Sequence, residues 1–244
     1  MARLRDSLPT GRALLILPVA LAGFSFNTAA SDLLEVNFSD GYAEGEVSGQ
    51  AGGLTGGPWQ ASGPLYQVEK AFEKGLVLRV SRHDGAVAYV PLARPLSTDA
   101  AAFYIGFDAY RATAESRAYW APAAAASSPI TGVGVTVLSS GMVELITDWN
   151  FTRQPTGFQM APERWHRFEL EVNGEAKTFN AFVQVEGEPG RKQIGKDLSW
   201  APKNKMIGLL RISQPDGGPQ SVVYTDRIDV KSDVAFPFTM PLQR

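Results

Sequence analysis

Apolar and polar side chains alternate along most of the chain after residue 30, and this period of two residues predicts β-strands. In residues 167–172, for example, Phe168, Leu170 and Val172 would share one face of a strand and charged side chains the other. The alternating runs are short and are bounded by Gly, Asp, Asn and Pro, which favour turns. The sequence therefore predicts an all-β protein with roughly ten to twelve strands.

Turn-forming residues separate many of these strands into pairs. Four hairpins are expected, at residues 77–92, 132–147, 165–186 and 205–231. The Asp-Gly and Asn-Gly pairs in two of their turns supply the positive φ that tight hairpins need. Two further strands are predicted at residues 33–38 and 101–110. Such antiparallel strands pack naturally as a two-sheet β-sandwich, or jelly roll.

The first thirty residues have the pattern of a cleaved signal peptide. Arg3, Arg5 and Arg12 make the start basic, residues 13–26 are apolar, and Thr28-Ala29-Ala30 supplies small side chains at the end. A membrane anchor is the alternative, but the apolar run is shorter than the roughly 18 residues needed to span a bilayer. No second apolar run of that length follows. We therefore expect cleavage after residue 30 and a secreted or periplasmic protein without a membrane span.

Residues 31–244 are predicted to form a single β-sandwich domain. The Gly-rich segment 51–57 and the Ala-rich segment 112–130 are predicted loops, because neither has a domain's worth of strands on both sides. The chain has no cysteine, which excludes disulfides and thiolate metal sites. A domain of about 200 residues buries roughly 70% of its unfolded surface and is stable without them.

The charge balance gives no reason to expect nucleic acid or an anionic membrane as a partner. The chain carries 23 basic and 25 acidic residues, a formal net charge of -2. Such partners are attracted by an excess of basic side chains. With only two histidines and no cysteine, the sequence also argues against a catalytic zinc site.

Three segments, in order along the chain, resemble the concanavalin A-like lectin/glucanase superfamily, and in particular its laminin-G-like jelly-roll members in secreted bacterial proteins. They are residues 33–38 with the Gly-rich run up to Trp59, residues 165–174 with 179–183, and residues 223–230. Together they extend over nearly all of the chain after the signal peptide. The resemblance implies a curved two-sheet sandwich, often with a carbohydrate site on its concave face.

Two catalytic motifs of that superfamily are absent from the sequence. Its glucanases carry Glu-x-Asp-x-x-Glu on one strand, so that the carboxylates share a face and can flank a glycosidic bond. The nearest match is Glu144 with Asp148, which has only two carboxylates. Its polysaccharide lyases carry Gln-Ile/Val-His, whereas residues 67–69 and 184–186 read Gln-Val-Glu. The sequence therefore favours binding over catalysis by either route.

The predicted strand at 101–110 offers a candidate sugar site. Tyr104, Asp108 and Tyr110 share the face opposite its apolar side chains. An aromatic ring can stack on the apolar face of a pyranose while a carboxylate accepts hydrogen bonds from its hydroxyls. Trp120 and Trp149, both in predicted loops, are further candidate contacts. The alternative is a solvated outer face, with tryptophans that plug the edge of the sandwich.

The resemblance also implies a structural calcium ion. Sandwiches of this kind often bind calcium with an acid of the first strand and an aspartate of the closing strand, and the matching positions are Glu35 and Asp226. Calcium takes about six to eight oxygen ligands, so backbone carbonyls of Gly-rich loops would have to complete the site. The alternative for Asp226 is a salt bridge or exposure to water.

Three functions remain open. The first is a non-catalytic protein that binds a polysaccharide or another glycan. The second is a structural or adhesion module that binds protein. The third is a polysaccharide-degrading lyase or glycoside hydrolase, with Asp108, Glu144, Asp148 and His166 as candidate acids and bases. This third function requires two of these side chains to flank one bond, although the phase of His166 places it toward the core.

Overall fold

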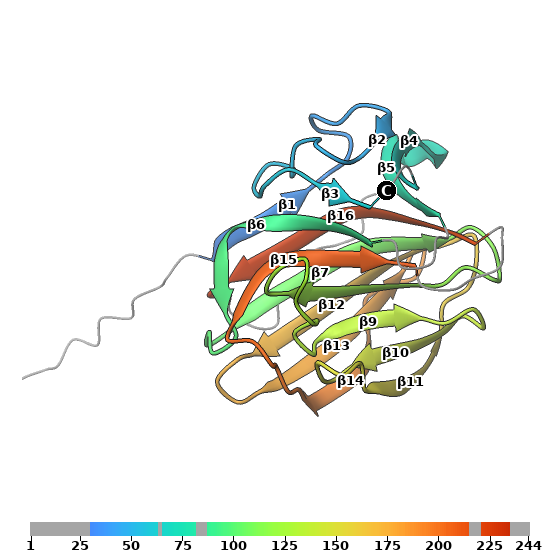
Figure 1. Cartoon of the computed structure of the whole chain (residues 1–244). Coiled ribbons are helices and arrows are strands. Elements are labelled where there is room, and N and C mark those ends of the chain that lie inside the picture. The colour runs from blue at the N-terminus through green and yellow to red at the C-terminus, as the bar shows by residue number, and fades with distance from the viewer. Residues whose placement is uncertain (1–29, 63–64, 82–86, 215–220, 235–244) are drawn as a thin grey trace, which may run out of the picture.

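The computed structural model describes residues 30–62, 65–81, 87–214 and 221–234. Over these ranges the chain forms sixteen strands and one short 3-10 helix, η1 (Phe72–Lys74). The strands make two antiparallel sheets that face each other, which confirms the predicted all-β sandwich (Figure 1). No helix in the described part of the chain is long and apolar enough to cross a membrane. The predicted signal peptide lies outside the described residues, apart from Ala30.

The larger sheet, sheet A, has nine strands. Eight of them follow the order β14-β13-β12-β7-β16-β5-β4-β2, and β1 pairs with β16 beside this path. Their bounds are β1 (Ser31–Val36), β2 (Gly45–Glu46), β4 (Tyr66–Lys70), β5 (Leu76–Ser81), β7 (Phe103–Arg111), β12 (Trp165–Asn173), β13 (Thr178–Val185), β14 (Lys192–Ser199) and β16 (Val222–Ser232).

The smaller sheet, sheet B, has seven strands in the order β11-β10-β9-β8-β15-β6-β3. Their bounds are β3 (Gln60–Ala61), β6 (Val87–Ser97), β8 (Ala118–Ala123), β9 (Gly134–Val137), β10 (Met142–Ile146), β11 (Arg153–Gln159) and β15 (Met206–Ser213). Sheet B lies in front of sheet A in the view of Figure 1.

The core between the sheets is built from the inward-facing half of each alternating strand. β7 contributes Phe103, Ile105 and Phe107, and β12 contributes Phe168 and Leu170, all of them buried. Because successive side chains of a strand point to opposite faces, the same alternation turns the intervening residues of β7 and β12 to the outer face of sheet A. The core thus fixes which side chains form that outer face.

Trp120 joins the two sheets across this core. Its ring, from β8, stacks on Phe107 of β7 with 4.7 Å between the ring centroids. Its Nε1 donates a hydrogen bond of 3.0 Å to Oγ1 of Thr225 in β16. The sequence suggested an exposed Trp120 that could contact sugar. That prediction was wrong, because the side chain is only 1% exposed and has no face free for a ligand.

The error arose because the predicted loop at 112–130 contains a strand. β8 runs through the middle of it and pairs with β15 on one side and β9 on the other. Alanine and proline have low β-propensity, so its Ala-Pro-Ala end gives a weak strand signal. β8 and β9 nevertheless pack closely, since a Cβ at Gly134 of β9 would lie 2.6 Å from the carbonyl oxygen of Trp120 and 2.9 Å from Cβ of Ala121.

Two of the four predicted hairpins are confirmed and two are wrong. β9 pairs with β10, and β12 pairs with β13, as their turns indicated. In contrast, β5 joins sheet A beside β4 and β16, while β6 joins sheet B beside β15. β15 and β16 are likewise in different sheets. A turn signal shows where the chain reverses, but it does not show whether the next strand pairs or crosses to the facing sheet.

Candidate functional site

The candidate site lies on the outer face of sheet A, where three neighbouring strands present polar and aromatic side chains. Its outward-facing residues include Tyr104, Asp108 and Tyr110 on β7, Trp165, Arg167 and Glu169 on β12, and Tyr224, Asp226 and Asp229 on β16. In the strand register, Asp108 is flanked by Arg167 and Asp226, and Tyr110 by Trp165 and Tyr224. The register of the strands therefore divides this face into a polar part around Asp108 and an aromatic part around Tyr110.

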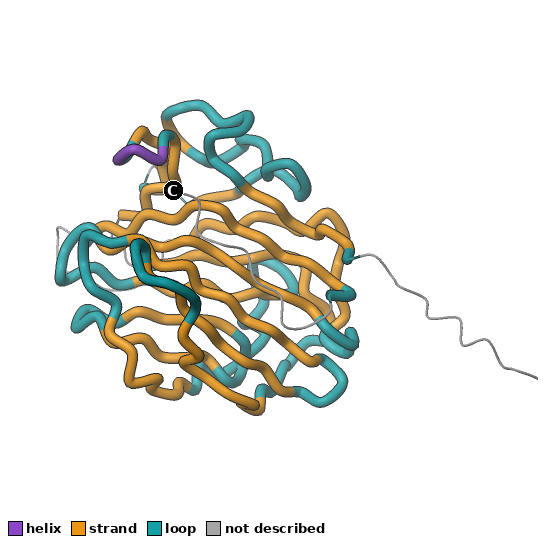
Figure 2. The backbone as a smooth tube through the Cα atoms, turned by 180° about the vertical axis from the view of Figure 1, so that it is seen from behind, coloured by secondary structure: helices purple, strands orange, loops and turns teal. Residues whose placement is uncertain are grey.

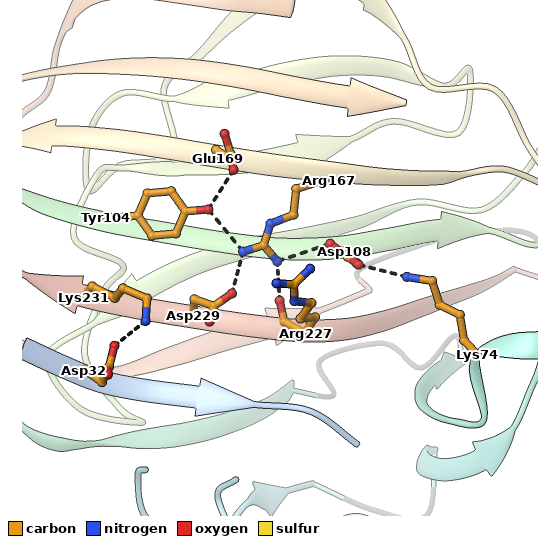
Figure 3. Close-up of polar contacts among 9 residues, drawn as sticks. All are labelled: Asp32, Lys74, Tyr104, Asp108, Arg167, Glu169, Arg227, Asp229 and Lys231. Carbon is orange, nitrogen blue, oxygen red and sulfur yellow. Dashed lines mark hydrogen bonds and ion pairs between the residues drawn. The ribbon is translucent and has the colours of Figure 1, made fainter. Parts of the chain in front are cut away.

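Arg167 is the centre of the polar part (Figure 3). Its Nη1 donates hydrogen bonds to Asp108, at 3.2 Å, and to the carbonyl oxygen of Arg227. Its Nη2 donates to the hydroxyl of Tyr104, at 3.1 Å, and to the carboxylate of Asp229. Burial alone would lower the pKa of Arg167, but these three side chains raise it overall. The guanidinium is therefore a permanent buried charge with two carboxylates as partners.

Gly106 makes room for this guanidinium. It sits between Tyr104 and Asp108 on the same face of β7, opposite Glu169. A Cβ at Gly106 would lie 2.4 Å from Nη2 of Arg167 and 2.4 Å from the hydroxyl oxygen of Tyr104. Any side chain at this position would therefore displace the buried network.

Tyr104 and Asp108 do not form the solvent-facing platform that the sequence suggested. Both side chains are fully buried. The hydroxyl of Tyr104 donates a 3.0 Å hydrogen bond to Glu169, and burial raises its pKa. The second oxygen of Asp108 accepts a hydrogen bond of 2.9 Å from Nζ of Lys74. With one oxygen bound to Arg167 and the other to Lys74, Asp108 has no free oxygen for a sugar hydroxyl.

Asp226 lies beside Asp108 and is only 8% exposed. Its Oδ1 makes no hydrogen bond to the described part of the chain. Burial, and after it the charge of Asp108, together raise the pKa of Asp226 to about 6, against the opposing effect of Lys74. The ionised form of Asp226 is therefore unfavourable in the folded protein, because it is buried beside another carboxylate.

Glu35 and Asp226, the acids expected to bind calcium, have different neighbours in the strand register. Glu35 of β1 lies opposite Asp229 in the register, whereas Asp226 lies opposite Asp108 on the other side of β16. In the ranges that the structure describes, no group of three or more His, Cys, Asp or Glu side chains is placed to hold a metal ion. The register therefore gives no support to a calcium ion shared by Glu35 and Asp226.

The aromatic part of the face contains a pocket of about 390 Å³, here called the aromatic pocket. Its lining residues are Phe72, Glu73, Lys74, Tyr110, Glu163, Trp165, Glu186 and Gly187. The ring of Phe72 lies 4.3 Å from that of Tyr110 and 6.2 Å from that of Trp165. Of the residues that the sequence suggested for a sugar site, only Tyr110 lines this pocket.

Phe72 is the exposed ring of the pocket. It belongs to η1, the purple segment in Figure 2, and is 52% exposed. Its backbone has φ of +61°, a left-handed conformation that costs a non-glycine residue roughly 1–2 kcal/mol. The amide of Ala71 donates a 3.0 Å hydrogen bond to the carbonyl of Gly75 and closes the turn around it. The turn thus holds an apolar ring in water at the cost of backbone strain, a combination found at functional sites.

The rim of the pocket is negatively charged. Glu73 and Glu163 are exposed and Glu186 is half-buried. None of the three makes an ion pair with a described residue, although Glu186 accepts a 3.4 Å hydrogen bond from the amide of Trp165. Among the described residues of the lining, the one basic side chain is Lys74, which is already paired with Asp108.

Sequence reasoning missed Trp165 and Phe72. Trp165 is the first residue of β12 and carried no distinguishing pattern, and its role depends on the register that places it beside Tyr110. Phe72 is placed by a turn that no strand pattern reveals. The signal that could have found Trp165 is pairing between the strands at 101–110 and 165–172, which brings Tyr110 and Trp165 together.

Trp149 follows β10 at the margin of sheet B and does not line the aromatic pocket. It is half-buried, and Nζ of Lys203 lies 4.2 Å from the centroid of its ring. The neighbouring Asp148 accepts hydrogen bonds from the amides of Asn150 and Thr152 and so closes the turn.

The four candidate acids and bases are not brought together. Asp108 lies on the outer face of sheet A, whereas Glu144 belongs to sheet B and pairs with Arg153 at 3.5 Å. Asp148 caps the turn after β10. Burial lowers the pKa of His166, which points into the core, to about 4, so the imidazole is neutral at pH 7. The four groups are therefore scattered over both sheets and the core.

No protein-family model and no curated protein matches the chain. Among solved structures, the chain is similar to the lectin UEA-II complexed with galactose, with a TM-score of 0.55, 8% identity, and coverage of 85% of this chain and 99% of that one. It is also similar to arcelin-5, a lectin-like defence protein from Phaseolus vulgaris, with a TM-score of 0.52, 10% identity, and coverage of 84% and 97%.

A third similar structure is the catalytic domain of a glycoside hydrolase family 131 protein from Coprinopsis cinerea, with a TM-score of 0.51, 12% identity, and coverage of 79% and 88%. Identities this low establish the fold alone. The chain therefore has the concanavalin A-like jelly-roll fold that its sequence resembles.

Proposed function

We propose that this chain is a non-catalytic carbohydrate-binding protein and that it holds its sugar in the aromatic pocket. The observation that carries the proposal is the exposed ring of Phe72, which a strained turn holds beside Tyr110 and Trp165 above a rim of carboxylates. Aromatic rings pack on the apolar face of a pyranose, and carboxylates accept hydrogen bonds from its hydroxyls. The volume of the pocket is also within the range of about 300–1,000 Å³ that is usual for ligand sites.

The fold supports this proposal. The lectin UEA-II, which shares the fold, was solved as a complex with galactose. A jelly roll of this kind can therefore present a sugar site. The pocket proposed here is inferred from the residues of this chain and not from those of the lectin.

The burial and the contacts of the ionisable groups favour binding over catalysis. A glycosidase needs a carboxylic acid that stays protonated, which burial provides, beside a second carboxylate. The rim residues Glu73 and Glu163 are exposed, and the buried Asp108 has both oxygens engaged. Asp226, whose pKa burial raises to about 6, lies beside Asp108 in the polar part of the face and does not line the pocket.

The test is electrophoresis in native gels cast with a panel of polysaccharides. We expect one or more polymers to retard the protein, and Trp165→Ala to abolish the retardation while circular dichroism shows an intact fold. Trp149→Ala is the matched control, because Trp149 is half-buried and lies outside the pocket. Loss of retardation in the Trp149 variant alone would place the sugar elsewhere. No retardation by any polymer would contradict the proposal and favour a protein-binding module.

Calcium provides a second arm of this experiment. Because Glu35 and Asp226 face different neighbours, we expect a chelator to leave the retardation unchanged. Loss of retardation on chelation, restored by added calcium, would show that an ion takes part in binding.

We also propose that the protein is exported through the signal peptide at residues 1–30. The basic start, the short apolar run and the small residues before Ser31 support this proposal. N-terminal sequencing of the exported protein should begin at Ser31. A protein that keeps residues 1–30 and stays in the cytoplasm would contradict it.

A further inference from the structure

We infer that the aromatic pocket recognises a sugar that carries a free, protonated amino group, in preference to neutral and acidic sugars. The inference rests on the proposed function and names the class of sugar for the same pocket. It is argued from the charges of the lining, from the aromatic rings, and from the engagement of Lys74.

The first argument is the unbalanced charge of the rim. Glu73, Glu163 and Glu186 line the pocket and make no ion pair with any described residue. In contrast, the nearby Glu188 is paired with Arg164 at 3.3 Å and with Lys192 at 2.7 Å. Three carboxylates around one pocket favour a cation there over an anion.

Two of these carboxylates also affect the pKa of Tyr110, which lines the pocket. Burial of its hydroxyl raises that pKa, and the charges of Glu163 and Glu186 raise it further. Because Tyr110 lines the pocket, a ligand beside it would lie close to the same two carboxylates.

The second argument is that the aromatic cluster already accommodates an ammonium group. Nζ of Lys74 lies 4.3 Å from the centroid of the Trp165 ring, a distance typical of a cation–π contact. Phe72 and Tyr110 extend the aromatic surface beyond Trp165. Phe72, which is 52% exposed, therefore offers a ligand ammonium a free ring face in the same pocket as the carboxylates.

The third argument is that Lys74 does not neutralise the rim. Its Nζ donates a hydrogen bond of 2.9 Å to the buried carboxylate of Asp108, which lies in the polar network and not in the pocket lining. Lys74 is thus committed to Asp108. An acidic sugar would meet three carboxylates and no uncommitted cation among the described residues of the lining.

The experiment is isothermal titration calorimetry of the full chain with three tetrasaccharides at a pH of about 6, below the usual pKa range of an amine. The probes are a β-1,4-linked glucosamine tetramer, the same tetramer with every amine acetylated, and a galacturonate tetramer. The first two differ only in the amine. We expect the free amine to bind about tenfold more tightly than its acetylated form, as a few exposed charge pairs would provide, and the galacturonate tetramer not to bind.

Charge-removing variants identify the source of that preference. Glu163→Gln and Glu186→Gln should each weaken binding of the glucosamine tetramer about threefold and leave binding of the acetylated tetramer unchanged. Glu188→Gln removes one charge from a paired carboxylate outside the lining and should change neither affinity. An equal loss in the Glu188 variant would mean that overall charge, not the pocket, attracts the amine, and the inference would be wrong.

The outcomes separate the inference from the proposed function. Equal affinity for the first two tetramers, or tighter binding of the acetylated one or of galacturonate, would overturn the inference and leave the sugar-binding function in place. If none of the three binds and no polysaccharide retards the protein, both are wrong.

Discussion

At the scale of single residues, Asp226 gives the sharpest prediction. Its pKa in the folded protein is about 6, against about 3.9 in an unfolded chain. Folding therefore takes up a proton between these values, so stability falls as the pH rises from about 4 to about 6 and stays lower above. Asp226→Asn removes this loss and should stabilise the protein at pH 7 by about 2 kcal/mol, with the gain shrinking toward pH 4. Urea unfolding across this pH range measures it.

Asp229→Asn is the matched control and should act in the opposite direction. Asp229 accepts a hydrogen bond from Arg167, so its loss leaves a buried guanidinium with one carboxylate fewer and should cost about 3–5 kcal/mol. If Asp226→Asn were as destabilising as Asp229→Asn, Asp226 would be a required partner in the Arg167 network. Its ionised form would then not be unfavourable in the folded protein.

The same residues show how far a strand pattern leads toward a site. Alternation placed Tyr104, Asp108 and Tyr110 on one face, and the structure agrees. Only Tyr110 reaches the pocket, because Arg167 on the neighbouring strand binds the other two. Which residue meets Arg167 depends on register between strands about sixty residues apart, and a local pattern carries no information about register.

At the scale of elements, the turn around η1 trades stability for an exposed ring. Phe72→Gly would relieve the positive φ, which glycine adopts freely, and would remove the ring from Tyr110 and Trp165. We expect the free energy of unfolding to change by less than about 1 kcal/mol, because relief of strain offsets the lost contacts of a ring that is 52% exposed. Sugar binding should fall at least about tenfold. Unfolding and calorimetry on the same samples give both numbers, and unchanged affinity would remove Phe72 from the site.

Elements also mark the limit of what turns can predict. The turns before β10 and β13 join neighbours in one sheet, and the sequence located both hairpins. In contrast, β5 and β6 lie in different sheets, and so do β15 and β16. Whether a strand pairs with the next strand or joins the facing sheet depends on partners far away along the chain. β16, for example, pairs with β1, β5 and β7.

At the scale of the whole molecule, the two sheets have different tasks. Sheet A carries the Arg167 network and the aromatic pocket on its outer face, and sheet B supplies the opposite wall of the core. The fold class could be predicted because a period of two residues is repeated along nearly the whole chain. The site could not, because Trp165, Tyr110 and Phe72 come from three separate elements that only the folded chain brings together.

The contact between the sheets yields the last prediction, which concerns Trp120. Its ring stacks on Phe107 and its Nε1 donates to Thr225, so it links β8 of sheet B to β7 and β16 of sheet A. Trp120→Ala should lower the free energy of unfolding by about 3–5 kcal/mol and leave the sugar affinity of the folded fraction unchanged. Trp120→Phe keeps a ring on Phe107 and loses the hydrogen bond, so it should cost clearly less. Thermal unfolding and calorimetry below the transition separate the two effects, and a stable Trp120→Ala variant that no longer binds sugar would restore Trp120 as a ligand contact.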